Sequence, residues 1–262
     1  MDRSFLSNES VVTASRRFVC VRLLTYESAE EADVLKSFFV GRSGQLENTT
    51  FALVAPDGKT KLARAGRSPD FAFRGGAGKT PAQEMAEAMD EIAARLEKTQ
   101  TAESGASPLP VTKTVRLGLD VAACDGLPLV VVYGDDAAKR AALTERLALL
   151  AWNATFVGRF TYVVGAAADV KPIEGATSKA GLLVVEPDEF GMAGTVLTQA
   201  PIDADAAKIT AALTEGLKRH HATAKDPRSH IEAGHRAGVH WETVIPDTDP
   251  GPPGGGPPPG GR

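Results

Sequence analysis

The sequence predicts an α/β protein made of two units with a similar order of elements, followed by a tail of proline and glycine. Short apolar runs typical of buried strands alternate with segments in which apolar residues recur at helical spacing. Residues 99–110 (TQTAESGASPLP) have no apolar period and contain two prolines, which is typical of a linker. Every residue from 250 to 261 is proline or glycine, a composition that predicts disorder. The predicted parts are a first unit at 1–98, the linker at 99–110, a second unit at 111–221, an arm at 222–248 and the disordered tail at 249–262.

Composition excludes several classes of protein. The 262 residues are 43% hydrophobic and carry a formal net charge of −4, so no strong positive field attracts nucleic acid. The longest apolar runs, such as Leu127–Tyr133, are far shorter than the roughly 20 residues that a membrane-crossing helix needs. The first twenty residues contain no secretory signal. We therefore expect a cytoplasmic protein as the chain is written, with a periplasmic or secreted location if its true start lies upstream.

The first unit shows helix caps, an apolar run and a turn. Ser7 or Asn8 can cap the first helix, and Ser28 precedes an amphipathic segment. Phe18–Leu24 (FVCVRLL) is apolar and rich in β-formers, which predicts a strand covered on both faces. Thr80 can cap a helix that begins with Pro81. The expected elements are helices at 8–16, 29–40 and 81–98, the strand at 18–24, and a hairpin at 51–66 with its turn at 56–59.

The second unit repeats this order loosely. Leu129–Tyr133 is an apolar run typical of a strand, and Asp135 begins a helical pattern. Pro187 and Asp188 favour a turn, as Pro56 and Asp57 do in the first unit. Both units therefore end with strand, turn, strand and helix, which is a repeat of architecture with little sequence identity. The expected elements are strands at 129–133 and 160–164, a hairpin at 182–197, and helices at 135–150 and 204–220.

Two segments resemble the thioredoxin-like family. MDRSFLSNESVVTASRRFVCVRL is similar to the segment that follows the redox Cys-x-x-Cys in that family, and NTTFALVAPDGKTKLARAG resembles its central strand and hairpin. The resemblance covers residues 1–98, and the second unit shares only the order of elements. It implies two mixed sheets flanked by helices. In the family a helix N-terminus at the corner after the first strand stabilises the reactive thiolate.

The departures from the family determine the expected function. The first unit lacks the opening strand and the Cys-x-x-Cys, and the corresponding corner of the second unit reads Gly134-Asp135-Asp136. The family's cis-proline is also missing. We therefore expect a thioredoxin-fold protein without a redox dithiol, which acts as a binding or scaffold module for protein and uses no cofactor. The alternative is a thiol-disulfide oxidoreductase whose dithiol is encoded upstream of Met1.

Two cysteines are candidate thiols. Cys20 lies within the predicted strand, where we expect it to be a small buried hydrophobe. Cys124 lies in a predicted turn and is expected to be more accessible, although Asp125 disfavours its thiolate.

A glycine-rich loop before the last helix of the first unit is a candidate phosphate-binding loop. Gly75–Thr80 ends in Gly-Lys-Thr and leads into a helix, so Gly76, Gly78, Lys79 and Thr80 are candidate nucleotide-binding residues. Phe73 occupies the place where the usual pattern has its first glycine. This favours a flexible loop before a capped helix, and nucleotide binding is the third function considered.

All five histidines lie between residues 220 and 240. His230, His235 and His240 recur every fifth position and are candidate metal ligands. Asp226-Pro227, Gly234 and Gly238 disfavour a regular helix there. The competing interpretation is an arm that docks Val239, Trp241 and Ile245 onto the domains.

The absent first strand predicts an uncovered sheet edge in the first unit. The segment Val111–Val121, a partner protein or a second copy of the chain could cover it. A homo-oligomer formed through this edge is therefore expected as one possible assembly.

Overall fold

The computed structural model describes residues 5–23, 28–41, 44, 46, 49–76, 78–99, 108–221 and 226–240. They fall into two compact units, unit 1 within residues 1–101 and unit 2 within residues 102–240. Of the arm predicted at 222–248, the described residues 226–240 belong to unit 2. The predicted tail and the rest of the arm lie outside the described residues. In the described part of the chain, no helix is both long enough and apolar enough to cross a bilayer.

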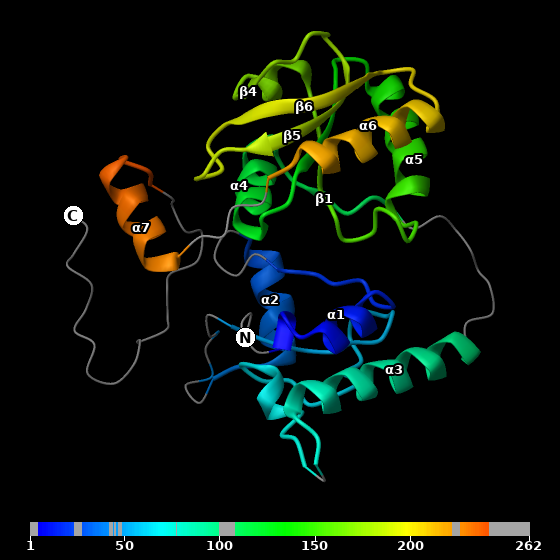
Figure 1. Ribbon diagram of the computed structural model, residues 1–262, viewed down its shortest axis with the longest axis vertical. Helices are drawn as coiled ribbons and strands as arrows, with labels where there is room; N and C mark the ends of the chain where they lie inside the picture. The colour runs from blue at the N-terminus through cyan, green and yellow to red at the C-terminus, as the bar shows by residue number, and fades with distance from the viewer. Residues whose placement is uncertain are drawn as a thin grey trace. The chain divides into compact units, whose positions relative to one another are not determined.

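Unit 2 is an α/β unit built on one mixed sheet of six strands (Figure 1). The strand order is β1-β3-β2-β5-β6-β4, with β1, β3 and β2 parallel to one another and β5 and β6 forming an antiparallel hairpin. The short β4 runs parallel to β6 at the far edge. The strands are β1 Val111–Thr112, β2 Leu129–Tyr133, β3 Thr161–Gly165, β4 Ile173–Glu174, β5 Gly181–Pro187 and β6 Gly194–Pro201.

Helices cover both faces of this sheet, and the side chains of β2 point alternately toward one face and the other. Leu129, Val131 and Tyr133 pack with helix α4 (Val115–Asp125) on one face. Val130 and Val132 pack on the other face with α5 (Ala137–Ala151) and α6 (Ala206–Arg219). Because successive strand side chains point to opposite faces, a fully apolar strand supplies both cores. The predicted strands and helices between 129 and 220 are confirmed, with bounds shifted by a few residues.

Acidic caps begin the two helices on the second face. The Asp136 carboxylate accepts hydrogen bonds from the backbone amides of Ala138 and Lys139 at 3.0 and 3.1 Å, and it thereby caps α5. The Asp205 carboxylate caps α6 by accepting from the amide of Lys208 at 2.9 Å. These bonds satisfy amides that have no partner within the helix. The amide of Lys139 is the largest cause of a lowered pKa for Asp136.

Both edge strands of the sheet are only two residues long, and a proline precedes each. Pro110 precedes β1 and Pro172 precedes β4. Short edge strands and prolines, which lack a backbone N–H, disfavour the addition of a further strand. The prediction that Val111–Val121 covers an edge of the first unit is wrong, because Val111–Thr112 pairs with β3 of unit 2 and the rest of the segment lies largely in α4.

Three helices organise unit 1, and all were predicted. They are α1 Glu9–Ser15, α2 Ala29–Phe38 and α3 Pro81–Thr99, and a 3₁₀ turn, η2, lies at Pro69–Phe71. The predicted stripe of α3 places Met85, Met89 and Ile92 in a buried cluster with Val11 and Ala14 of α1. The Asn8 and Ser28 side chains cap α1 and α2 as expected. Helix packing therefore supplies the core of this unit.

The mixed sheet predicted for unit 1 is not formed in the residues that the structure describes there. The expected strand Phe18–Leu24 is wrong for its described part, because residues 18–23 have neither helix nor strand structure. Val19 and Val21 are 65% and 69% exposed. The prediction failed because apolar β-forming residues make a strand only when a neighbouring strand supplies hydrogen-bond partners. The β-bridges among the described residues of unit 1 are Phe51–Gly66, Val54–Lys61 and Gly76–Lys79.

The hairpin predicted at 51–66 is present in irregular form. Leu62 N–H donates to the Leu53 carbonyl at 2.7 Å, and Ala55 N–H donates to the Thr60 carbonyl at 2.8 Å. The turn is organised by the Asp57 carboxylate, which accepts from the Thr60 hydroxyl at 2.6 Å and from the amides of Lys59 and Thr60. These bonds, the hydroxyl first, lower the pKa of Asp57 from 3.8 to about 2.

We expect the carboxyl group of Asp57 to titrate near pH 2 in the folded protein. Because its folded pKa lies below the ordinary value of 3.8, its contribution to stability is fully present above that value and is lost as the pH falls through about 2. A ¹³C NMR titration of the side-chain carboxyl measures this directly. Thr60→Val should raise the midpoint, and the control Thr60→Ser should preserve it. A wild-type midpoint near 4 would contradict the turn geometry.

Helix α7 (Pro227–Arg236) corrects the expectation of an irregular arm. The Asp226 carboxylate accepts from the Ser229 amide at 3.0 Å, so Asp226 is an N-cap. Pro227 takes the first helical position, where a missing N–H has no consequence. The Asp-Pro pair therefore begins a helix in place of breaking one. The ring of His230 stacks on Phe190 of the β5–β6 loop, with centroids 5.1 Å apart.

Candidate functional site

An apolar groove lies beside the β1 edge of unit 2, between the chain that leads into β1 and helix α5. Its volume is about 480 Å³, which falls within the range of about 300–1,000 Å³ typical of ligand sites. Leu149 of α5 is 66% exposed and Val111 of β1 is 47% exposed. The apolar lining residues are Pro108, Leu109, Val111, Ala148, Leu149 and Val164.

The wall of the groove formed by residues 108–111 is fixed to the core. The indole N–H of Trp152 donates to the Pro108 carbonyl at 3.2 Å. Leu109 is buried in the cluster that fills the α5 face of the sheet. Val111 pairs with Tyr162 of β3. The groove is therefore held open by folded structure on both sides.

Two polar residues, Thr144 and Glu145, complete the lining. The Thr144 hydroxyl donates to the Arg140 carbonyl at 2.8 Å, so the helix already uses its proton. Glu145 is the single charged residue among those that line the groove. The groove therefore suits an apolar side chain with a basic group nearby.

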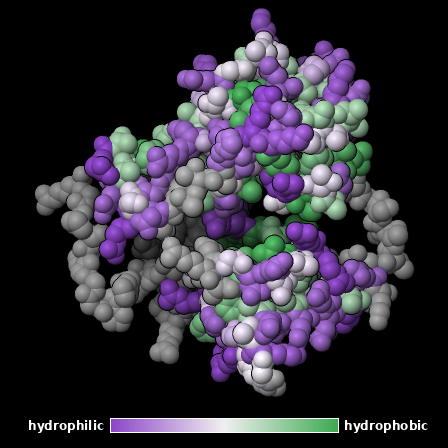
Figure 2. All heavy atoms as spheres, in the orientation of Figure 1, coloured by the Kyte–Doolittle hydropathy of each residue, from purple (hydrophilic) through white to green (hydrophobic). Residues whose placement is uncertain are grey.

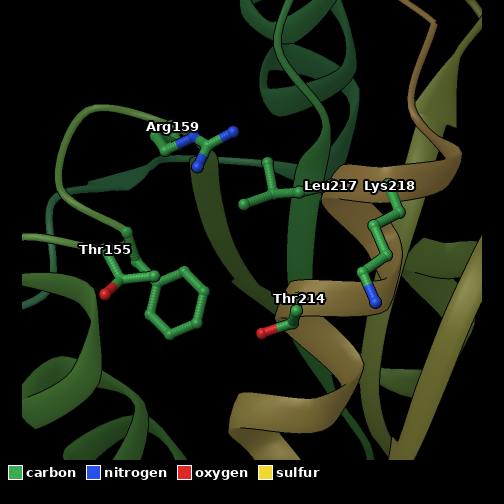
Figure 3. Close-up of a pocket in the computed structure, with 6 residues that line it drawn as sticks. Thr155, Arg159, Thr214, Leu217 and Lys218 are labelled. Atoms are coloured by element: carbon green, nitrogen blue, oxygen red, sulfur yellow. The ribbon is translucent and has the colours of Figure 1, made fainter.

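A second, smaller cleft lies between the α5–β3 connection and α6 (Figure 3), and its volume is about 190 Å³. Arg159 lies beside Leu217, while Lys218 extends along another side of α6, so the two cationic heads do not converge (Figure 3). Lys218 also lies 3.9 Å from Glu215. This arrangement does not build an anion site, and the larger groove is the better candidate. Figure 2 shows apolar and polar residues interspersed over the visible face of unit 2.

The corner between β2 and α5 holds carboxylates at the place where the resemblance would put a dithiol. Asp136 caps the helix, and Asp135 accepts from the amide of Ala167 at 3.2 Å. Behind the corner, the Tyr133 hydroxyl donates to the Ser178 carbonyl at 2.7 Å. The positive end of α5 is therefore already neutralised by an acidic cap. The described residues contain no cis peptide bond.

Searches against family models, curated proteins and solved structures each find no match.

The structure places both candidate thiols at the surface. Cys20 is exposed, which corrects the expectation of a buried core residue, because the strand that would bury it is not formed. Cys124 is exposed, as expected. It lies in the last turn of helix α4, whereas the sequence predicted a turn that belongs to no helix. The two cysteines belong to different units.

The glycine-rich loop has a geometry that opposes phosphate binding. Gly76 and Lys79 exchange backbone hydrogen bonds of 3.2 and 2.9 Å, which closes a tight turn. The Gly75 amide donates to the Glu84 carboxylate at 2.7 Å, so this carboxylate takes the backbone amide that a bound phosphate would need. Lys79 pairs with Glu87, which raises its pKa. Thr80 accepts from the amide of Gln83 at 3.3 Å and caps α3, as the competing interpretation expected, and Gly78 lies in the exposed turn.

The histidines have separate partners. His220 lies 2.8 Å from Glu186 and 2.9 Å from the Gly126 carbonyl, which ties the end of α6 to α4 and β5. The Nδ1 atom of His230 lies 3.3 Å from a carboxylate oxygen of Glu189. His235 follows on α7, and His240 lies beyond its end. Among the described residues, no three histidine, cysteine or acidic side chains gather into a metal site. Trp241 and Ile245 lie outside the described residues.

Sequence analysis missed the groove. Leu149 departs from the buried stripe of α5, in which Leu143 and Leu147 are fully buried. An exposed leucine beside that stripe was the available signal. Val111 gave no such signal, because its exposure depends on its place at the edge of the sheet.

Proposed function

We propose that the chain is a non-catalytic, protein-binding module whose unit 2 has thioredoxin-like architecture. The order strand-helix-strand-helix-strand, hairpin and helix supports this assignment, as do the three parallel strands beside an antiparallel pair. The acidic corner at Asp135 and Asp136 supports a role without disulfide exchange at that place.

The groove beside β1 carries the proposal. Its two most exposed apolar members, Leu149 and Val111, would be covered by an apolar side chain of a partner. The two-residue β1 and Pro110 disfavour strand addition at this edge. Binding therefore proceeds through side chains that enter the groove. Glu145 favours a partner segment with lysine or arginine next to its apolar anchor.

Selection from a random peptide library displayed on phage tests this function. We expect the immobilised chain to enrich peptides with an apolar anchor and an adjacent basic residue. Leu149→Glu should weaken binding of a selected synthetic peptide by about 10- to 100-fold, which corresponds to losing the burial of one large apolar side chain. Fluorescence anisotropy measures the dissociation constants.

Two variants sharpen the experiment. Ile231→Glu also places a glutamate at an exposed large aliphatic residue, here on α7, and should leave the affinity unchanged. Glu145→Lys should reverse the charge preference toward acidic peptides. Failure to enrich any peptide, or equal binding by wild type and Leu149→Glu, would remove the proposal.

A further inference from the structure

Residues 18–23 (FVCVRL) of unit 1 form an exposed apolar segment with strand-forming composition. Val21 is the most exposed of the large hydrophobic residues described, at 69%, and Val19, at 65%, is exceeded otherwise only by Leu149 of unit 2, at 66%. Cys20 between them is also exposed. Consecutive β-formers without proline, glycine or an acidic residue are typical of a strand that pairs with another strand. The segment therefore has the composition of a strand but takes no strand structure in the part of the chain that the structure describes.

The segment is anchored where it leaves α1. Arg17 makes ion pairs with Asp90 at 3.2 Å and Glu97 at 3.0 Å, both on α3. Phe18 packs against the buried cluster of unit 1, and its amide donates to the Ser15 carbonyl at 2.9 Å. The valines that follow are therefore presented from a fixed position on the folded unit.

We propose that residues 18–23 pair with the same segment of a second copy of this chain, as antiparallel strands centred on Cys20. In this register Val19 lies opposite Val21 of the other copy, so two β-branched cross-strand pairs form on one face. Arg22 lies opposite Phe18, and no like charges face each other. Centring on Val21 would instead place Cys20 opposite Arg22 and replace both Val19–Val21 pairs. The sequence is thus self-complementary in the proposed register, which is what favours a second copy as the occupant.

Cys20 reports on the pairing. Directly opposed residues of antiparallel strands have Cα atoms about 4.5–5.5 Å apart, within the span of about 4.4–6.8 Å that a disulfide bridges. Diamide, a two-electron oxidant, would convert the two opposed thiols into one disulfide and be reduced to its hydrazine. The oxidant serves only as a probe, and the proposed contact itself needs no covalent bond.

The experiment compares two single-cysteine chains, one with Cys124→Ser and one with Cys20→Ser. Both retain one exposed thiol, so the Cys20→Ser chain gives the background that random collision produces. We expect rapid formation of a covalent dimer through Cys20 and little through Cys124, as seen on non-reducing gels after diamide treatment. Sedimentation velocity without oxidant should show a concentration-dependent dimer.

Val19→Lys combined with Val21→Lys in the chain that retains Cys20 is the decisive variant. Both side chains are exposed, so folding should be preserved, which circular dichroism checks. Loss of the valine pairs should slow cross-linking by about tenfold. Equal cross-linking of the two single-cysteine chains, an unaffected rate in the lysine variant, or a monomer at every concentration would each overturn the proposal. Because the groove lies in unit 2, these outcomes are independent of the peptide-binding test.

Discussion

Leu147→Ala is expected to lower the free energy of unfolding of unit 2 by about 2 to 5 kcal/mol. Leu147 is completely buried on α5, within the cluster that joins α5 and α6 to the sheet. Truncation removes methyl groups from a close-packed environment and leaves a cavity that the surrounding elements fill only in part. Urea unfolding followed by far-UV circular dichroism measures the loss.

Leu149→Ala is the matched control for this prediction. It makes the same chemical change on the same helix, two residues away, at a side chain that solvent already reaches. Its effect on stability should stay within about 0.5 kcal/mol. Comparable losses for the two variants would contradict the burial of Leu147 and the exposure of Leu149 on α5. The two residues thus separate stability from binding, because Leu149 is also the proposed peptide contact.

Gly191→Ala is expected to destabilise unit 2 by about 2 to 5 kcal/mol. Gly191 lies in the β5–β6 loop with φ of +65°, and a Cβ there would lie 2.5 Å from the Asp120 Cα of α4. The loop is fastened at this point, since Arg116 donates to the Gly191 carbonyl at 2.6 Å. Alanine therefore adds backbone strain and forces the loop away from α4. Thermal unfolding measures the combined effect.

Gly158→Ala separates the two contributions. Gly158 has φ of +70°, but a Cβ there would meet nothing within 4 Å. This variant should carry only the left-handed strain, about 1 to 2 kcal/mol. If Gly158→Ala and Gly191→Ala cost the same, the close approach of the β5–β6 loop to α4 would be refuted.

The elements of unit 2 were predictable because local pattern and tertiary environment agree there. Leu129–Tyr133 is apolar throughout, and the sheet covers it on both faces. Asp136 and Asp205 precede helical patterns and act as caps. The two-residue strands β1 and β4 have no periodicity to detect, so only the structure reveals them. The sequence interpretation also passed over α4, although Thr114 caps it and Val115, Leu119 and Ala122 recur at helical spacing.

Unit 1 shows where local pattern is insufficient. Phe18–Leu24 has the composition of an inner strand, yet strand formation needs a neighbour, and sequence composition does not supply one. Asp226-Pro227 was misjudged for the opposite reason, since the same pair that interrupts a helix interior also begins a helix. At the candidate site, the position of Leu149 beside the buried stripe of α5 was a readable signal, whereas the exposure of Val111 depends on its place at the sheet edge, which the local sequence does not show.

The edge strands β1 and β4, each two residues long and preceded by a proline, affect how unit 2 behaves when many copies are close together. A β-sheet whose edge strands are too short to pair with a further strand does not extend by adding identical strands. Unit 2 could therefore be displayed densely on a surface, or repeated along a longer polypeptide, without seeding fibres through its own backbone.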